Sequence, residues 1–228
     1  ETGTIVQELV GHDGSVRYLA FSEDGQSLIS GSFGDSNILR HNLDTGQATP
    51  LLPSDATSND ELLYVSDSLF FVPQGEDPTT IALWNLETNE MLQTFEGHLG
   101  IIWALDINPA TQILYSGSRD SSLYAWDIES GDIVAEFAGH SAAIFDIDLS
   151  PDGTRLVSAS ADQTAIVWDA VTGEQLMTLY AHTASVSNTE FSPDGQFILT
   201  AGADGRIILW DVTTGELRNI YVGGQNAL

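Results

Sequence analysis

Residues 139–169 read GHSAAIFDIDLSPDGTRLVSASADQTAIVWD, and this stretch decides the fold because its pattern returns along the chain. Trp168 has counterparts 42 residues away on either side, at Trp126 and Trp210, and Trp84 stands a further 42 residues upstream of Trp126. Each of these tryptophans is followed by Asp or Asn, and a Gly-His or Ala-His pair precedes the last three at the same interval. A period of this length indicates an array of stacked repeats.

One repeat contains four short segments with the character of β-strands. In the quoted repeat these are Ala143–Ser150, Arg155–Ser160, Ala165–Trp168 and Gln175–Tyr180, and Pro151-Asp152-Gly153 forms a tight turn after the first. The apolar runs are short and rich in β-branched residues, and no segment has a helical period. The sequence therefore predicts an all-β protein with four antiparallel strands in each repeat.

Two weaker repeats lie upstream. His41 stands where the tryptophan of the first repeat is expected, and His12 stands where its Gly-His histidine is expected. Thr4–Val10 reads as a sixth outer strand, whereas the chain contains only five sets of three inner strands. We therefore expect an outer strand of a preceding repeat over residues 1–10, five repeats over 11–53, 54–96, 97–138, 139–180 and 181–222, and the start of a further repeat over 223–228.

The Gly-His pair, the Ser-Pro-Asp-Gly turn, the second Asp-containing turn and the Trp-Asp pair together resemble the repeats of WD-repeat β-propellers. The resemblance covers the whole chain and is weakest in the second repeat, where Ala82-Leu83-Trp84-Asn85 is retained. It implies that each repeat is one blade of a propeller and that the chain is a five-repeat segment of a larger, bacterial-type protein. Because most family members have seven blades, we expect an open arc or part of a seven-bladed ring, with a closed five-bladed ring as the alternative.

The resemblance also implies a buried hydrogen-bonded chain of His, hydroxyl, Asp and Trp in each complete repeat. The matching residues are His98, Ser116, Asp120 and Trp126, then His140, Ser158, Asp162 and Trp168, then His182, Thr200, Asp204 and Trp210. A catalytic triad would use similar residue types, but such a site is built once, whereas this set recurs three times. We therefore interpret the set as structural.

The first two repeats depart from this pattern. The first has His12, Ser30 and Asp35 but His41-Asn42 in place of Trp-Asp, so we expect its hydrogen-bonded chain to be incomplete. The second has Ser54-Asp55 in place of Gly-His.

The composition limits the classes of partner. Thirty-three acidic residues oppose six arginines, for a net charge of -27, so a nucleic acid backbone would be repelled. The chain has no cysteine, no apolar run approaching the roughly 20 residues that cross a bilayer, and no basic and apolar N-terminal region typical of a signal peptide. We expect a soluble, cytoplasmic protein that binds neither nucleic acid nor membranes.

A search for reactive motifs finds no phosphate-binding loop, no His-Glu-x-x-His and no Gly-x-Ser-x-Gly. Asp146 and Asp148 share one strand face but lack the loop carboxylates of a calcium site. We expect no enzyme activity, no cofactor and no metal.

The resemblance also implies that a partner binds on the narrow face of the propeller, around the central channel, and the candidate binding residues occupy positions that point towards this face. There Ile101, Trp103 and Phe145 are apolar, Arg119 lies beside them, and Arg17 takes an equivalent position in the first repeat. Aromatic side chains with an arginine are typical of interaction hot spots. Alternatively, Trp103 and Phe145 fill the gap between adjacent blades.

We therefore expect a non-catalytic protein-interaction scaffold or sensor that binds a protein or peptide through these residues. Alternatively, the chain is an accessory domain of a multidomain enzyme. A second hypothesis places binding in the acidic second repeat, at Asp55, Asp60, Glu61, Asp67, Glu76 and Asp77. Open sheet edges also favour association with further blades or protomers.

Overall fold

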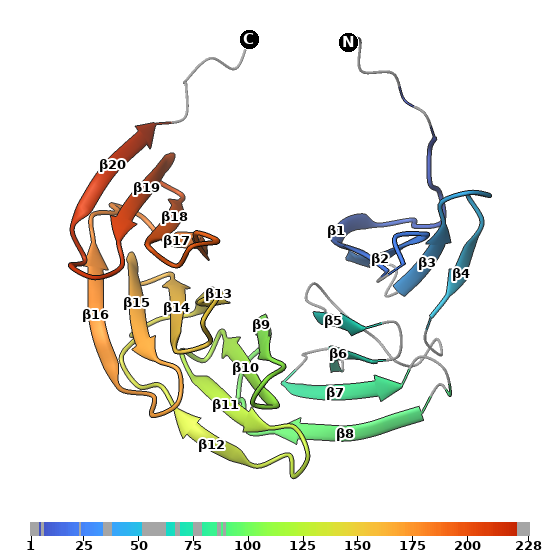
Figure 1. The fold of residues 1–228 in the computed structure, drawn as a ribbon, viewed down its shortest axis with the longest axis horizontal. Helices are drawn as coiled ribbons and strands as arrows, with labels where there is room; N and C mark the ends of the chain where they lie inside the picture. The colour runs from blue at the N-terminus through green and yellow to red at the C-terminus, as the bar shows by residue number, and fades with distance from the viewer. Residues whose placement is uncertain are drawn as a thin grey trace. The chain divides into compact units, whose positions relative to one another are not determined.

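The computed structural model describes residue 5 and residues 7–22, 24–33, 38–51, 63–66, 69–74, 79–85, 88 and 90–222. In these residues the chain forms five antiparallel sheets of four strands each and no helix (Figure 1). The expected all-β propeller fold with five four-stranded blades is therefore confirmed. The chain divides into two compact units, Glu1–Gly97 and His98–Leu228.

The first unit contains two sheets. The first sheet has the strands β1 (Ser15–Phe21), β2 (Ser27–Phe33), β3 (Ile38–Asn42) and β4 (Ala48–Pro50). The second sheet has the strands β5 (Leu63–Ser66), β6 (Leu69–Gln74), β7 (Thr80–Asn85) and β8 (Glu90–Glu96).

The second unit contains the other three described sheets. The third sheet has the strands β9 (Ile102–Asn108), β10 (Ile113–Ser118), β11 (Leu123–Asp127) and β12 (Ile133–Glu136). The fourth has β13 (Ile144–Leu149), β14 (Arg155–Ser160), β15 (Thr164–Asp169) and β16 (Gln175–Tyr180). The fifth has β17 (Val186–Phe191), β18 (Phe197–Gly202), β19 (Arg206–Asp211) and β20 (Leu217–Val222).

The aspartate after each late tryptophan forms the turn between the third and fourth strands. Asp169 Oδ1 accepts hydrogen bonds from the backbone N–H groups of Val171 and Thr172 at 3.0 and 2.8 Å, and from the Thr172 hydroxyl at 2.9 Å. Gly173 completes this turn with a φ of 75°, a left-handed conformation that favours glycine. The hydrogen bonds of Asp169 and the left-handed conformation of Gly173 therefore explain why Thr172-Gly173 comes shortly after Trp168-Asp169 in this repeat.

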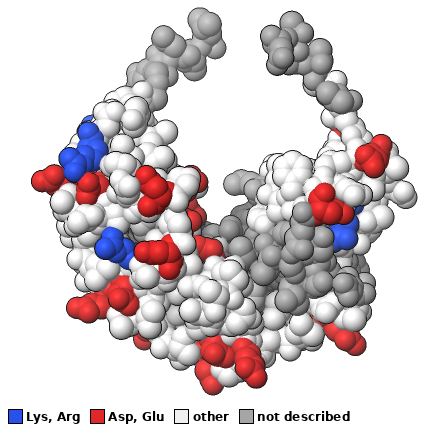
Figure 2. Space-filling model, viewed as in Figure 1, with Lys and Arg blue, Asp and Glu red and all other residues white. Residues whose placement is uncertain are grey.

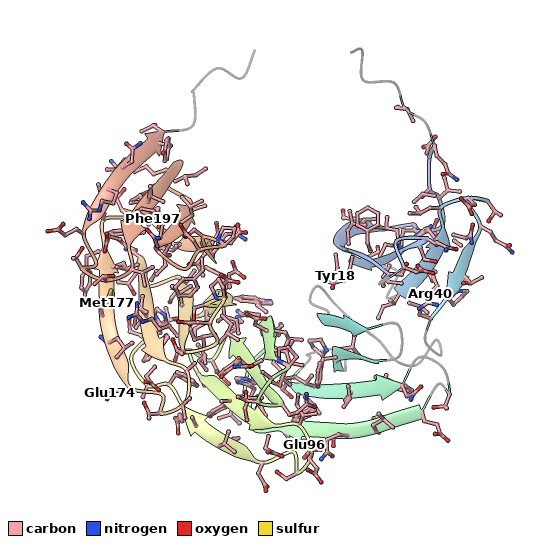
Figure 3. All side chains as sticks on the ribbon, viewed as in Figure 1. Tyr18, Arg40, Glu96, Glu174, Met177 and Phe197 are labelled. Atoms are coloured by element: carbon pink, nitrogen blue, oxygen red, sulfur yellow. The ribbon has the colours of Figure 1, made fainter. Side chains whose placement is uncertain are left out.

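Apolar side chains fill the space between successive sheets within each unit. Tyr115 and Phe137 of the third sheet pack with Leu156 and Trp168 of the fourth. Val157 and its neighbours then pack against Ile198 and Trp210 of the fifth sheet, and Met177 of the fourth sheet (labelled in Figure 3) packs against the same cluster. In the first unit Tyr18, also labelled in Figure 3, packs against a cluster of Ile29, Ile38 and Val72. Burial of these faces is the main force that holds the sheets together.

The predicted outer strand over Thr4–Val10 is not present in the residues that are described there. Ile5 and residues 7–10 lie in no strand, and Thr4 and Val6 lie outside the described residues. With its side-chain amide oriented to satisfy both polar atoms, Gln7 donates to the Leu43 carbonyl at 2.8 Å and accepts from the Gly46 N–H at 3.0 Å. A strand requires a paired backbone, and the contact of Gln7 is made by its side chain instead.

Figure 2 shows carboxylates distributed over the visible face of both units, with few arginines among them. No helix in the described ranges is long and apolar enough to span a bilayer.

Candidate functional site

The fourth sheet contains the polar chain that the repeat pattern indicates. His140 Nδ1 lies 2.8 Å from Asp162 Oδ2, and His140 Nε2 lies 2.7 Å from Ser158 Oγ. The Trp168 indole N–H donates to the same Ser158 oxygen at 2.8 Å. The pattern assigns a neutral imidazole protonated on Nδ1, with Ser158 donating to Nε2. Every link of this buried chain then has one donor and one acceptor.

Burial controls the charge of these groups. It lowers the pKa of His140, although Asp162 opposes this shift by favouring the imidazolium. Burial also works against ionisation of Asp162, but hydrogen bonds from Thr164, His140 and Ser141 outweigh it and lower the pKa of that carboxyl. The expected charge state is therefore a neutral histidine beside an ionised aspartate.

The fifth sheet repeats the arrangement with a threonine in the central position. His182 Nδ1 lies 3.0 Å from Asp204 Oδ1, and its Nε2 lies 2.8 Å from Thr200 Oγ1. The indole N–H of Trp210 donates to Thr200 Oγ1 at 2.9 Å.

In the third sheet a serine stands between the histidine and the aspartate. His98 Nε2 lies 2.7 Å from Ser116 Oγ, which accepts from Trp126 at 2.8 Å. His98 Nδ1, however, lies 2.7 Å from Ser122 Oγ, which in turn donates to Asp120, and the distance from Nδ1 to Asp120 Oδ2 is 3.7 Å. Burial lowers the pKa of His98 to about 4, and the Asp120 carboxylate opposes this shift without reversing it.

The first sheet contains a link that the sequence did not indicate. His41 Nε2 lies 2.7 Å from Ser30 Oγ, and His12 Nε2 lies 2.7 Å from the same oxygen. His41 therefore makes the hydrogen bond that the tryptophan indole makes in the later sheets. The link from His12 through Ser30 to His41 is thus present in the first sheet. Asp35 lies outside the described residues.

In the second sheet the central hydroxyl is absent. Trp84 pairs with Phe70 as Trp168 pairs with Leu156, so Val72 occupies the place of Ser158. The buried indole nitrogen of Trp84 has no hydrogen-bond partner.

These polar chains have the chemistry of a structural element. Ser116, Ser158 and Thr200 are buried, and each oxygen is already engaged by a histidine and a tryptophan. A nucleophile must reach its substrate, whereas these hydroxyls are enclosed. Within the described residues, no group of three or more His, Asp or Glu side chains is arranged to hold a metal ion.

The candidate binding residues of the second unit lie close together. The rings of Trp103 and Phe145 stack with centroids 5.2 Å apart and planes 24° apart. The guanidinium carbon of Arg119 lies 6.0 Å from the centroid of the Trp103 ring, within the range of a cation–π contact. Both aromatic side chains are half-buried and Arg119 is exposed, while the Arg119 backbone N–H donates to the carbonyl of Ile101 at 2.8 Å. The structure thus brings Ile101, Trp103, Arg119 and Phe145 together.

A β-bulge explains the direction of both aromatic side chains. In β9 the pairing with β10 passes from Ala104 to Ile102 and omits Trp103, and in β13 it omits Phe145 in the same way. A bulged residue is released from the regular alternation of the strand. The same irregularity occurs at Arg17 in β1 and at Ser187 in β17, although the Arg17 side chain lies outside the described part of the structure.

The sequence placed Asp146 and Asp148 on one strand face, but it did not show that these carboxylates, together with Asp106, join successive sheets. Asp106 Oδ2 accepts from the Leu149 N–H at 2.6 Å, Asp146 Oδ2 from the Thr189 N–H at 2.8 Å, and Asp148 Oδ2 from a backbone N–H of β17. Burial raises the pKa of Asp106, and it raises the pKa of Asp146 to about 6. Asp106 and Asp148 stand one repeat period apart, and this spacing could have indicated that they have the same role in successive sheets.

The acidic residues of the second-repeat hypothesis, Asp55, Asp60, Glu61, Asp67, Glu76 and Asp77, lie outside the described residues, so that hypothesis stays a prediction.

Part of the chain is similar to subunits I of eukaryotic translation initiation factor 3 from fungi. The protein of Neurospora crassa is 39% identical over 57 residues, which are 25% of this chain and 16% of the relative. The Emericella nidulans protein is 33% identical over 73 residues, or 32% of this chain and 21% of the relative. The Botryotinia fuckeliana protein is 40% identical over 43 residues, or 19% of this chain and 13% of the relative. The chain therefore matches only a small part of the length of these relatives.

The family model described as "WD domain, G-beta repeat" matches residues 3–40, 89–127, 131–169 and 173–211. These segments cover most of the chain and omit most of the second repeat, whose motifs are weakest. The chain belongs to the WD40 repeat family.

Proposed function

We propose that this chain is a non-catalytic protein-interaction domain whose main docking patch consists of Ile101, Trp103, Arg119 and Phe145. The observation that carries this proposal is the half-buried stack of Trp103 and Phe145 at two neighbouring β-bulges. Two aromatic rings with an exposed arginine supply much contact area at a low entropy cost, as in interaction hot spots. Arg17, at the equivalent bulge of the first sheet, stays a separate prediction of a binding residue in the first unit.

The family and the relatives support the class of function. The relatives are named as subunits of an initiation factor, that is, as components of an assembly. A scaffold role with protein partners, without catalysis or a cofactor, follows by analogy, and so does a location in the cytoplasm. The use of this chain within a larger regulatory protein is the alternative that the same fold allows.

The packing interpretation competes directly with the docking interpretation. If Trp103 and Phe145 served only to fill the space between β9 and β13, their exposed edges would have no further role. A regular strand would place these side chains in the alternating pattern, whereas the bulge releases them from it. This geometry favours docking.

The test compares capture of partners by the full-length protein and by its Trp103→Ala variant. Quantitative mass spectrometry of proteins retained from an extract of the source organism should show partner affinity reduced roughly 30-fold, or about 2 kcal/mol. Ser187→Ala is the matched control because Ser187 occupies the equivalent bulge of the fifth sheet. Unchanged capture by Trp103→Ala, or unfolding of this variant in a thermal melt, would contradict the proposal.

A further inference from the structure

A groove lies between the third and fourth sheets, and both of its walls belong to the unit His98–Leu228. Its volume is about 270 Å³. Pockets for small molecules usually have roughly 300–1,000 Å³, so this groove suits a few side chains of a peptide. Val134 is 54% exposed and Val171 is 74% exposed, so the apolar lining reaches the surface. The aromatic and aliphatic residues of the lining are Ile113, Tyr115, Ala125, Val134, Ala170 and Val171.

The equivalent space between the fourth and fifth sheets contains an arginine. Arg155 stands one period after Ile113, and its Nη1 donates to the Val212 carbonyl at 3.4 Å. The depression there is lined by charged residues that include Asp152 and Asp194. Ile113 brings no charge to the corresponding place, so the groove between the third and fourth sheets is the apolar one of the two.

The outer strand of the fifth sheet shows what can bind next to such a groove. β20 has a bulge at Arg218, whose Nη2 donates to Asp211 Oδ2 at 2.7 Å. β12 of the third sheet has the same bulge at Val134, two periods upstream, and Asp127 stands where Asp211 stands. The third sheet therefore has the carboxylate of this ion pair, but a valine in place of the arginine.

Asp127 borders the groove. It follows Ala125 by two residues on β11, so both side chains lie on the same side of the sheet, and Ala125 lines the groove. Asp127 is also the cross-strand neighbour of Ile113, another lining residue. Its Oδ1 accepts the Ser130 N–H at 2.8 Å, and it forms no ion pair with any residue that the structure describes. An unpaired carboxylate thus stands at the edge of an apolar surface.

We propose that this groove binds a peptide segment of a partner protein in which an arginine stands next to an apolar residue. The guanidinium of that arginine pairs with Asp127 as the Arg218 guanidinium pairs with Asp211. The aliphatic stem of the arginine covers Val134, and the neighbouring apolar side chain enters the groove. Arginine is the assigned residue because this chain itself places a guanidinium at the equivalent carboxylate.

The charge of the chain favours such a segment. The net charge of -27 attracts basic sequences and repels acidic ones, so binding should weaken as the salt concentration rises. The groove is also distinct from the patch of Trp103, Phe145 and Arg119. That patch offers an arginine beside aromatic rings, whereas the groove offers a carboxylate beside aliphatic side chains.

The experiment begins with a random heptapeptide library displayed on phage. Peptides retained by the wild type but not by Val134→Arg are selected, because this variant should pair with Asp127 from within the chain, as Arg218 pairs with Asp211. We expect the selected peptides to contain an arginine next to a leucine, isoleucine, valine or phenylalanine. Fluorescence anisotropy then measures the affinity of the selected peptides for each variant.

Asp127→Asn removes the charge and keeps the turn. Asn42 and Asn85 stand at this position in the first two sheets, where their Oδ1 atoms accept backbone N–H groups as Asp127 Oδ1 does. Asp127→Asn should weaken binding about fivefold, and Val134→Arg at least about tenfold. Glu216→Gln removes one exposed charge of the fifth sheet and should leave binding unchanged, and so should Trp103→Ala, which tests the other patch.

Replacement of the peptide arginine by citrulline provides the decisive measurement, because it removes the charge without any change to the protein. The citrulline peptide should bind the wild type about fivefold more weakly, and Asp127→Asn should then cause no further loss. Thermal melts establish that each variant retains the fold. Selected peptides that lack arginine, an empty selection, or independent effects of citrulline and Asp127→Asn would overturn the proposal.

Discussion

The carboxylate of Asp148 accepts a hydrogen bond from the backbone N–H of Phe191 at 2.5 Å, and this bond joins the fourth sheet to the fifth. Burial raises the pKa of Asp148 to about 7, and the nearby charges of Asp106, Asp146 and Glu190 act in the same direction. Ionisation of Asp148 at the contact between the two sheets therefore lowers the stability of the fold as the pH rises.

Stability should fall as the pH rises from about 4 to about 7 through the titration of Asp148. In this window the unfolded chain has released the proton, because its pKa is near 3.8, while the folded protein still holds it. Asp148→Asn keeps an acceptor for Phe191 and removes the titration, so it should become more stable than the wild type by about 2 kcal/mol towards pH 7. Urea unfolding at several pH values measures this difference, and Asp132→Asn controls for the loss of one surface charge. Parallel pH profiles for the wild type and Asp148→Asn would contradict the assignment.

Trp84 and Trp168 should respond differently to the same substitution. Trp168→Phe leaves Ser158 without the indole donor and should cost about 1–3 kcal/mol. Trp84→Phe removes a buried N–H that has no partner, so it should cost about 1 kcal/mol less than Trp168→Phe. Both changes remove a similar volume, and chemical denaturation compares them. Equal destabilisation would show that packing alone governs these positions.

His98 should remain neutral in the folded protein well below the pH at which a histidine ordinarily protonates. Burial lowers the pKa of His98 from 6.5 to about 4. Since the unfolded chain takes up this proton first, stability should be lost as the pH falls from about 6.5 towards about 4. Imidazole resonances followed by NMR report the titration directly. A midpoint near 6.5 for His98 would contradict the buried geometry.

Removal of a central hydroxyl should disturb a whole polar chain. Ser158→Ala leaves both His140 Nε2 and the Trp168 N–H without their partner, so we expect a loss of about 2–4 kcal/mol. Ser141→Ala is the control because the exposed Ser141 enters the chain only through its backbone N–H. If both variants unfolded at the same denaturant concentration, the chain would contribute little to stability.

Regular repeats allowed much of the fold to be predicted. The predicted strands Arg155–Ser160 and Gln175–Tyr180 coincide with β14 and β16, because each strand is bounded by turns whose residues are local in the sequence. The outer strand expected over Thr4–Val10 required a neighbouring strand to pair with, and its own residues do not specify that neighbour. The described residues of this segment lie in no strand.

The candidate site was predicted less completely. Spacing brought Trp103 and Phe145 to equivalent positions, but it gave no sign of the bulges that release both side chains. It also missed Ser122 between His98 and Asp120, because Thr164 carries a hydroxyl at the equivalent position while His140 contacts Asp162 directly.

The sequence by itself determined the period, the strand and turn pattern and the all-β class, because each of these depends on residues within one repeat. Only the tertiary structure decided which side chains meet across successive sheets, as in the bond between Asp148 and Phe191 and the stack of Trp103 on Phe145. Such contacts join residues about one repeat apart, and their geometry depends on how two folded sheets pack, which no local pattern encodes.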